Sequence, residues 1–294
     1  MKLLTYLEPE GSQRVGALGD GGYVVPLSWR CGRPVQCMID LIKGRLSDAH
    51  RIDDALDGST LRWLAPIPRP ERNLFCVGKN YAEHAREFSL SGFDSSSSTH
   101  GIPEHPIVFS KTPQTVIGPG ATIWDAAGVS DALDYEAELA VVIGKPGRAI
   151  SPENAMEHVW GYTALNDVTA RDWQKRHQQW HLGKSFDTFA PMGPVIVTAD
   201  ELHWRGLELR CWVNGDLRQR ATTADLIFDV PTLIATISQG ITLQPGDIIA
   251  TGTPEGVGLG FTPPRYLKRG DRIAIEIAGI GKLENEVGPW PEPL

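Results

Sequence analysis

Apolar residues along this chain occur in short runs, continuous or alternating with polar residues, and turn-forming residues separate them. Runs of roughly four to eight residues with this pattern are typical of β-strands. Beyond residue 190, only residues 228–238 show a clear helical pattern. The 31 glycines and 22 prolines imply many turns, which favours strands over a helical bundle. We therefore predict an α+β fold that is mostly β, with strands at residues 74–78, 133–144, 159–166, 190–197, 207–213, 248–251, 272–277 and 282–287.

A proline-rich segment, residues 64–70, separates the beginning of the chain from the rest. Proline fixes its own φ and disfavours the helical region for the preceding residue, so this segment is expected to be stiff and extended. We place a domain boundary there, between a small N-terminal α/β domain in residues 1–68 and a larger domain in residues 69–294. The smaller domain is expected to contain strands at residues 2–7 and 22–26 and a helix at residues 39–56.

Two glutamates lie two positions apart at the start of the apolar strand of residues 133–144. Alternate residues of a strand point to the same face, so Glu136 and Glu138 are expected to lie side by side, where a cation would relieve their repulsion. Two exposed glutamates on an edge strand are the ordinary alternative. Asp167 follows the strand of residues 159–166, and a third carboxylate there would complete an all-oxygen site for Mg²⁺, Mn²⁺ or Ca²⁺.

A histidine and a glutamate three residues apart follow the strand of residues 74–78. Asn80 is expected to cap the helix that carries them, so His84 and Glu87 share one face. A carboxylate partner orients an imidazole and raises its basicity, which suits a general base, although an exposed surface pair has the same spacing. The serine-rich loop of residues 89–106 comes next, and it is either a lid or a disordered insert.

Basic and polar residues that could bind an anion follow Asp167. Thr169 and Asp172 are expected to cap a helix, and its Arg171, Gln174, Lys175 and Arg176 are substrate-binding candidates or else a solvated helix face. A second lysine, Lys184, lies among small residues, where a partly desolvated ammonium would stabilise an enolate. The remaining candidates are Lys111, a weaker case of the same kind, and the glycine-rich loop that begins at Thr251, whose backbone N–H groups suit a carboxylate.

The overall charge of the chain limits its partners. A net charge of −8 argues against nucleic acid, whose recognition rests on basic surfaces. The four cysteines form no C-x-x-C pair, which favours reduced thiols over a zinc cluster. No apolar stretch approaches the ~20 residues needed to cross a membrane, and the first residues lack the pattern of a signal peptide. We expect a cytoplasmic protein that binds neither nucleic acid nor membrane.

The order of these motifs resembles that of the fumarylacetoacetate hydrolase family over roughly residues 72–288. The resemblance implies a β-roll catalytic domain in a homodimer, with one Mg²⁺ or Mn²⁺ per subunit and an acylpyruvase-like activity on a small anionic oxo acid. The motifs that carry it are Val77-Gly78-Lys79-Asn80-Tyr81 with His84 and Glu87, Tyr135-Glu136-Ala137-Glu138-Leu139, residues 166–172, Gly183-Lys184-Ser185-Phe186 and Thr251-Gly252-Thr253-Pro254.

The resemblance also assigns roles to the candidate residues. It implies that Glu136, Glu138 and Asp167 hold the metal. It makes His84 and Glu87 a water-activating dyad on a lid that orders when substrate binds. Of the remaining candidates, it matches Gln174, Lys184 and Thr251 to positions that contact the substrate.

Three functions are compatible with these residues. The first is hydrolysis of a C–C bond in an acylpyruvate or β-diketone: His84 activates water, Lys184 neutralises developing charge and the metal stabilises the enolate that leaves. The second is decarboxylation or isomerisation of an oxo acid of the oxaloacetate or hydroxymuconate type, which needs less from the dyad. The third is a non-catalytic metal-binding protein, which has no need of His84 and Glu87.

Overall fold

The computed structural model describes residues 1–44, 46–51, 54–90 and 102–291. Strands dominate it, so the prediction of a mostly β fold of the α+β class is confirmed. The large sheet follows the order β4-β3-β2-β1-β15-β13-β12-β18-β7-β8, and β5, β6 and β9 pair at its sides. These strands are β1 (Lys2–Leu7), β2 (Gln13–Leu18), β3 (Tyr23–Trp29), β4 (Ala49–Arg51), β5 (Leu56–Asp57), β6 (Arg62–Trp63), β7 (Leu74–Gly78), β8 (Ile107–Lys111), β9 (Val116–Ile117), β12 (Ala137–Ile143), β13 (Val159–Asn166), β15 (Ala190–Thr198) and β18 (Ile248–Ala250).

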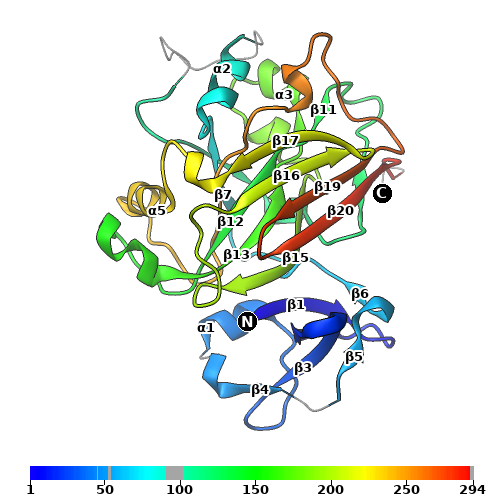
Figure 1. Ribbon diagram of the computed structural model, residues 1–294, viewed down its shortest axis with the longest axis vertical. Coiled ribbons are helices and arrows are strands. Elements are labelled where there is room, and N and C mark those ends of the chain that lie inside the picture. Colours follow the sequence, from blue (N-terminus) through cyan, green and yellow to red (C-terminus); the bar gives the residue numbers. More distant parts are fainter. Residues whose placement is uncertain (45, 52–53, 91–101, 292–294) are drawn as a thin grey trace.

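A second sheet of five strands packs in front of β12, β13 and β15 (Figure 1). Its order is β10-β20-β19-β16-β17, and the predicted Asn214-Gly215 turn joins its β16–β17 hairpin. Its strands are β10 (Thr122–Trp124), β16 (Glu208–Val213), β17 (Asp216–Thr222), β19 (Arg272–Ile277) and β20 (Gly281–Gly288), and the short pair β11 (Leu133–Asp134) and β14 (Thr169–Ala170) lies apart. The helices are α1 (Met38–Lys43), α2 (Ala82–Leu90), α3 (Arg171–Arg176), α4 (His181–Lys184) and α5 (Val230–Ser238).

Strand β12 lies at the centre of the molecule and is buried along its whole length. Leu139, Val141 and Ile143 belong to the core between the two sheets, whereas Ala140 and Val142 belong to a second core on the opposite face. A strand covered on both faces needs a continuous apolar run rather than an alternating one. The run after Glu138 therefore fixes β12 in the interior, and it carries the acidic pair inside with it.

The N-terminal region differs from its prediction. Its described residues form strands β1–β6, one short α-helix and three short 3-10 helices, and over residues 46–51 and 54–56 they do not continue the α-helix predicted for residues 39–56. Gly44 ends α1, with an extended backbone of φ −77° and ψ −178°. Strand β1 pairs with β15, so the large sheet continues from the N-terminal region, at the bottom of Figure 1, into the rest of the molecule. The division into residues 1–68 and 69–294 stays a prediction.

Candidate active site and metal centre

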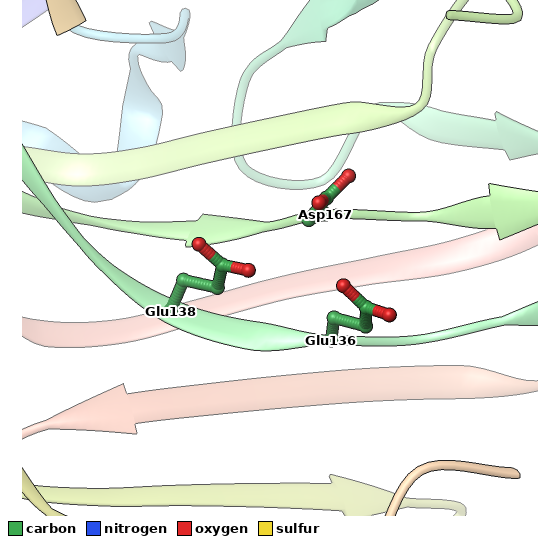
Figure 2. Close-up of side chains that lie close together, drawn as sticks. All are labelled: Glu136, Glu138 and Asp167. Atoms are coloured by element: carbon green, nitrogen blue, oxygen red, sulfur yellow. The ribbon is translucent and has the colours of Figure 1, made fainter. Parts of the chain in front are cut away.

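Pairing of β12 with β13 brings the three candidate metal ligands together. Glu136 immediately precedes β12, and Asp167 immediately follows β13. In the antiparallel register Ala137 lies opposite Asn166, and the backbone N–H of Asp167 donates to the carbonyl of Glu136 at 2.8 Å. Figure 2 shows the side chains of Glu136, Glu138 and Asp167 pointing toward one shared space. One oxygen of each lies within 4.8 Å of one oxygen of the others.

Three buried cations surround these carboxylates. The Lys184 ammonium donates to Oε2 of Glu136 at 2.7 Å and to Oδ2 of Asp167 at 2.8 Å. Arg171 lies 2.7 Å from Oε1 of Glu136, and Lys111 donates to Oδ1 of Asp167 at 2.6 Å. Glu136 and Asp167 therefore each contact two cations.

The pKa values of Glu136 and Glu138 are shifted in opposite directions. Burial by itself would raise the pKa of Glu136, but Lys184 and Arg171 outweigh it and lower that pKa to about 2. Burial raises the pKa of Glu138 well above its usual range, and the charges of Asp167 and Glu136 add to the effect. Glu138 is thus the carboxylate whose negative charge the surrounding protein compensates least.

The donor set fits a divalent cation that prefers oxygen. Three convergent carboxylates are the ligands that Mg²⁺, Mn²⁺ and Ca²⁺ select, and no thiol or imidazole belongs to the group that could hold the ion. An ion there would also supply the positive charge that Glu138 lacks. Glu136, Glu138 and Asp167 are the side chains that would hold it.

The predicted dyad is formed on α2. Nδ1 of His84 lies 3.0 Å from Oε2 of Glu87, and the imidazole is only 4% exposed, so the pair is not on the open surface. Asn80 does not cap α2 as predicted. Its side chain instead bonds the backbone of Phe228 at 2.7 and 2.9 Å and the carbonyl of Thr251 at 2.8 Å. Asn80 thus fixes the start of the helix against two distant loops.

A narrow cavity lies between His84 of the dyad and the carboxylates of Glu136 and Glu138. Its lining includes one member of the predicted dyad and two of the three predicted metal ligands. Its lining comprises His84, Glu136, Glu138, Arg171, Gln174 and Lys184 among the predicted residues, together with Val77, Gly78, Lys79, Phe88, Phe109, Trp180 and Thr253.

Two predicted substrate-binding residues lie outside this lining in the described part of the chain. Lys111 is fully buried, and its ammonium is engaged with Asp167 and with the carbonyl of Val168. The hydroxyl of Thr251 donates to the carbonyl of Leu139 at 2.9 Å. Arg171 and Gln174 do line the cavity, but Arg171 is already paired with acidic groups. The functional roles of these residues remain predictions.

Some of the lining was not predicted from the sequence. Lys79 is only 2% exposed, has a φ of 55°, and places its ammonium 5.4 Å from the centre of the Phe88 ring. A left-handed backbone at a buried lysine is strained and is more common at functional sites than elsewhere. The motif around Lys79 was recognised, yet nothing local indicated that its side chain turns inward. Thr253, two positions after Thr251, is the hydroxyl of that loop that lines the cavity.

Two further predictions have clear outcomes. Helix α3 has no side-chain cap: the Thr169 hydroxyl donates to the carbonyl of Asp167, and Asp172 accepts from Ser130. Capping by Thr169 and Asp172 is therefore wrong. The predicted lid or insert of residues 89–106 lies largely outside the described residues.

Replacing Lys111 with methionine is expected to destabilise the metal-free protein by roughly 3–5 kcal/mol, because it breaks a fully buried ion pair and leaves Asp167 undercompensated. Denaturant unfolding measures the loss. Lys43→Met is the matched control: it breaks the exposed Lys43–Glu71 pair and should leave stability unchanged. A loss of less than about 1 kcal/mol at Lys111 would contradict a structural role for this cation.

Comparison with known proteins identifies the class. Residues 73–288 match the family described as fumarylacetoacetate (FAA) hydrolase C-terminal, and the chain belongs to this family of enzymes. The resemblance inferred from the motifs is confirmed.

Two relatives of this chain are named oxaloacetate tautomerases. The chain is 52% identical to oxaloacetate tautomerase YisK of Bacillus subtilis over 231 residues, 78% of this chain and 74% of that protein. It is 40% identical to the mitochondrial oxaloacetate tautomerase fahd2 of Xenopus laevis, over 98% of this chain and 90% of that protein.

Two solved structures have the same fold. A fumarylacetoacetate hydrolase of Exiguobacterium antarcticum is 39% identical with a TM-score of 0.81, over 99% of this chain and 100% of that chain. A 2-hydroxyhepta-2,4-diene-1,7-dioate isomerase of Mycobacterium marinum is 32% identical with a TM-score of 0.79, over the same shares of the two chains. No helix among the described residues is both long and apolar enough to span a membrane.

Proposed function

We propose that this enzyme is an oxaloacetate tautomerase, which interconverts the enol and keto forms of a small 2-oxo dicarboxylate. The observation that carries the proposal is the 52% identity to a relative with that name, in a chain where His84, Glu136 and Glu138 line one cavity. It favours the isomerase alternative over C–C bond hydrolysis, the first function inferred from the sequence.

The metal site supports this chemistry. A divalent ion held by Glu136, Glu138 and Asp167 would polarise the 2-oxo group and so acidify the neighbouring C–H bond. Lys184, which bridges Glu136 and Asp167, fixes those two carboxylates in place. The buried cations around them neutralise carboxylates inside a protein of net charge −8, so an anionic substrate meets less negative charge there.

The proton transfer is assigned to His84. When Nδ1 donates to Glu87, the neutral imidazole keeps Nε2 as a base. In the keto-to-enol direction His84 takes the proton from C3, and the electrons of that C–H bond form the C2–C3 double bond. The π electrons of the 2-oxo group move to its oxygen, which takes the proton back from the imidazolium of His84. The reverse steps return the keto form, so no water is consumed and no C–C bond breaks.

Lys79 and Gln174 are proposed to contact the substrate carboxylates. Both line the cavity and both are 2% exposed, so an anion reaching them leaves water behind. Hydrogen bonds to a charged group are stronger than neutral ones in such a site. Arg171 is proposed to hold Glu136 rather than the substrate, because its guanidinium is already paired with Asp134 and Glu136.

The test measures tautomerisation and decarboxylation of the same substrate, oxaloacetate. Freshly dissolved enol oxaloacetate is mixed with the Mg²⁺- or Mn²⁺-loaded enzyme, the loss of enol absorbance is followed, and pyruvate is measured in the same samples. We expect enol loss to accelerate with no pyruvate above the uncatalysed level. Pyruvate formed in step with enol loss would show decarboxylation and overturn the proposal.

Hydrolysis of an acylpyruvate is the second candidate, and the His84–Glu87 geometry favours it specifically. A histidine oriented by a carboxylate at 3.0 Å can activate water as well as a C–H bond. Release of pyruvate from acylpyruvates, without acceleration of oxaloacetate tautomerisation, would establish this function instead.

A further inference from the structure

The Glu87 carboxylate is held from two sides. Its Oε2 meets Nδ1 of His84, and its Oε1 accepts a hydrogen bond from the backbone N–H of Gly256 at 3.1 Å. Each oxygen has its own partner, so the orientation of the carboxylate depends on the histidine and on the glycine-rich segment of residues 256–260 together. This segment lies 169 residues from Glu87 in the chain.

The segment of residues 256–260 is itself anchored. The backbone N–H groups of Gly258 and Leu259 donate to the two carboxylate oxygens of the fully buried Asp134 at 2.6 and 3.0 Å. Val257 and Leu259 also pack in one apolar cluster with Phe88 of α2. The backbone that contacts Glu87 is therefore fixed by hydrogen bonds and by packing against the helix that carries the dyad.

Gly260 leaves the space that the Glu87 carboxylate occupies. A Cβ atom on Gly260 would lie 1.7 Å from Oε1 of Glu87 and 2.2 Å from its Cδ, and all three of its nearest contacts belong to Glu87. The backbone of Gly260 lies outside the left-handed region, so alanine is conformationally allowed there. An added methyl group would therefore meet the end of the Glu87 side chain first, and this flexible end can move aside.

We propose that residues 256–260 are a positioning element of the dyad, which holds Glu87 in the orientation that keeps His84 ready for proton transfer. The inference rests on the proposed role of His84. Gly256 supplies the hydrogen bond and Gly260 supplies the room. Neither Gly256 nor Gly260 belongs to the cavity lining, so we expect their effect to pass through Glu87.

Gly260→Ala tests the proposal. We expect kcat for tautomerisation to fall by about 100-fold, because a displaced Glu87 no longer orients His84. KM, metal affinity and melting temperature should stay at wild-type values, since the substituted position is exposed and lies away from the cavity lining. Gly240→Ala is the matched control: this exposed glycine has an ordinary φ and nothing within 4 Å of an added Cβ, so the variant should match wild type.

A double-mutant cycle separates positioning from general damage. Glu87→Ala makes room for the methyl group, so adding Gly260→Ala to it should reduce kcat no further. If Gly260→Ala lowers the melting temperature, the double variant should restore it. A further loss of kcat, or a failure of that restoration, would overturn the inference.

The same set of variants separates this inference from the proposed function. Loss of activity in His84→Ala together with wild-type kcat in Gly260→Ala would overturn the positioning role and leave the proposed function standing. Wild-type activity in His84→Ala would remove the proposed role of His84, and the inference would fall with it.

Discussion

Glu138→Gln is expected to remove nearly all turnover while making the metal-free protein more stable at neutral pH. The loss of turnover should be on the order of a thousandfold, because a Lewis-acid ion supplies several kcal/mol of transition-state stabilisation and Glu138 would be one of its three ligands. The gain in stability follows from the pKa of Glu138, which burial and the neighbouring Asp167 and Glu136 raise well above the ordinary 4.5.

The stability of the metal-free protein depends on pH through Glu138. In the metal-free folded protein Glu138 retains its proton at a pH where the unfolded chain has already lost it. The folded state therefore binds more protons above pH 4.5, and its stability falls as the pH rises toward the folded pKa. Glutamine carries no charge and removes this loss.

Melting temperatures with and without Mn²⁺ measure both effects. Wild type should be stabilised by the ion and Glu138→Gln should respond little, whereas in chelator the variant should melt above wild type. Glu157→Gln is the control, since Glu157 is exposed and pairs with the exposed Lys145. A variant that still gains stability from Mn²⁺ as wild type does would contradict the assignment of Glu138 as a ligand.

His84→Ala should lower kcat by roughly 10²- to 10⁴-fold, the usual contribution of a positioned general acid–base. KM and Mn²⁺ affinity should change little, because His84 is not among the three proposed metal ligands. The protein should stay folded, since the imidazole contacts Glu87 and lies beside Phe88 of the smallest apolar cluster, away from the two large cores. Stopped-flow measurement of enol loss gives kcat and KM separately.

His50→Ala is the control for that substitution. His50 is exposed on β4, in the N-terminal region, and its loss should change neither parameter. Wild-type kcat in His84→Ala would mean that another group in the cavity carries the proton, and Lys79 would then be the next residue to replace.

Local patterns predicted that the three carboxylates converge, for physical reasons. Alternate side chains of a strand point to the same face, which predicted that Glu136 and Glu138 lie side by side. The apolar run after them indicated a buried strand. Asp167 follows the run that forms β13, and antiparallel pairing of β12 with β13 brings it to Glu136. The spacing of His84 and Glu87 fixed their contact as soon as α2 formed.

Contacts between distant segments could not be predicted in this way. Lys111 lies 56 residues before Asp167, and nothing in its own surroundings indicates a buried partner. Asn80 has the local pattern of a helix cap, but Phe228 and Thr251 compete for its side chain in the folded protein. The α-helix predicted over residues 39–56 ends early, because Gly44 takes an extended backbone and ends α1.

Diffraction from a crystal of the enzyme grown with Mn²⁺ tests the central claim most directly. We expect a single anomalous peak among Glu136, Glu138 and Asp167, with at least one oxygen of each at about 2.0–2.6 Å from the ion. A fully occupied Mn²⁺ bound elsewhere, with these three side chains left without an ion, would contradict the account.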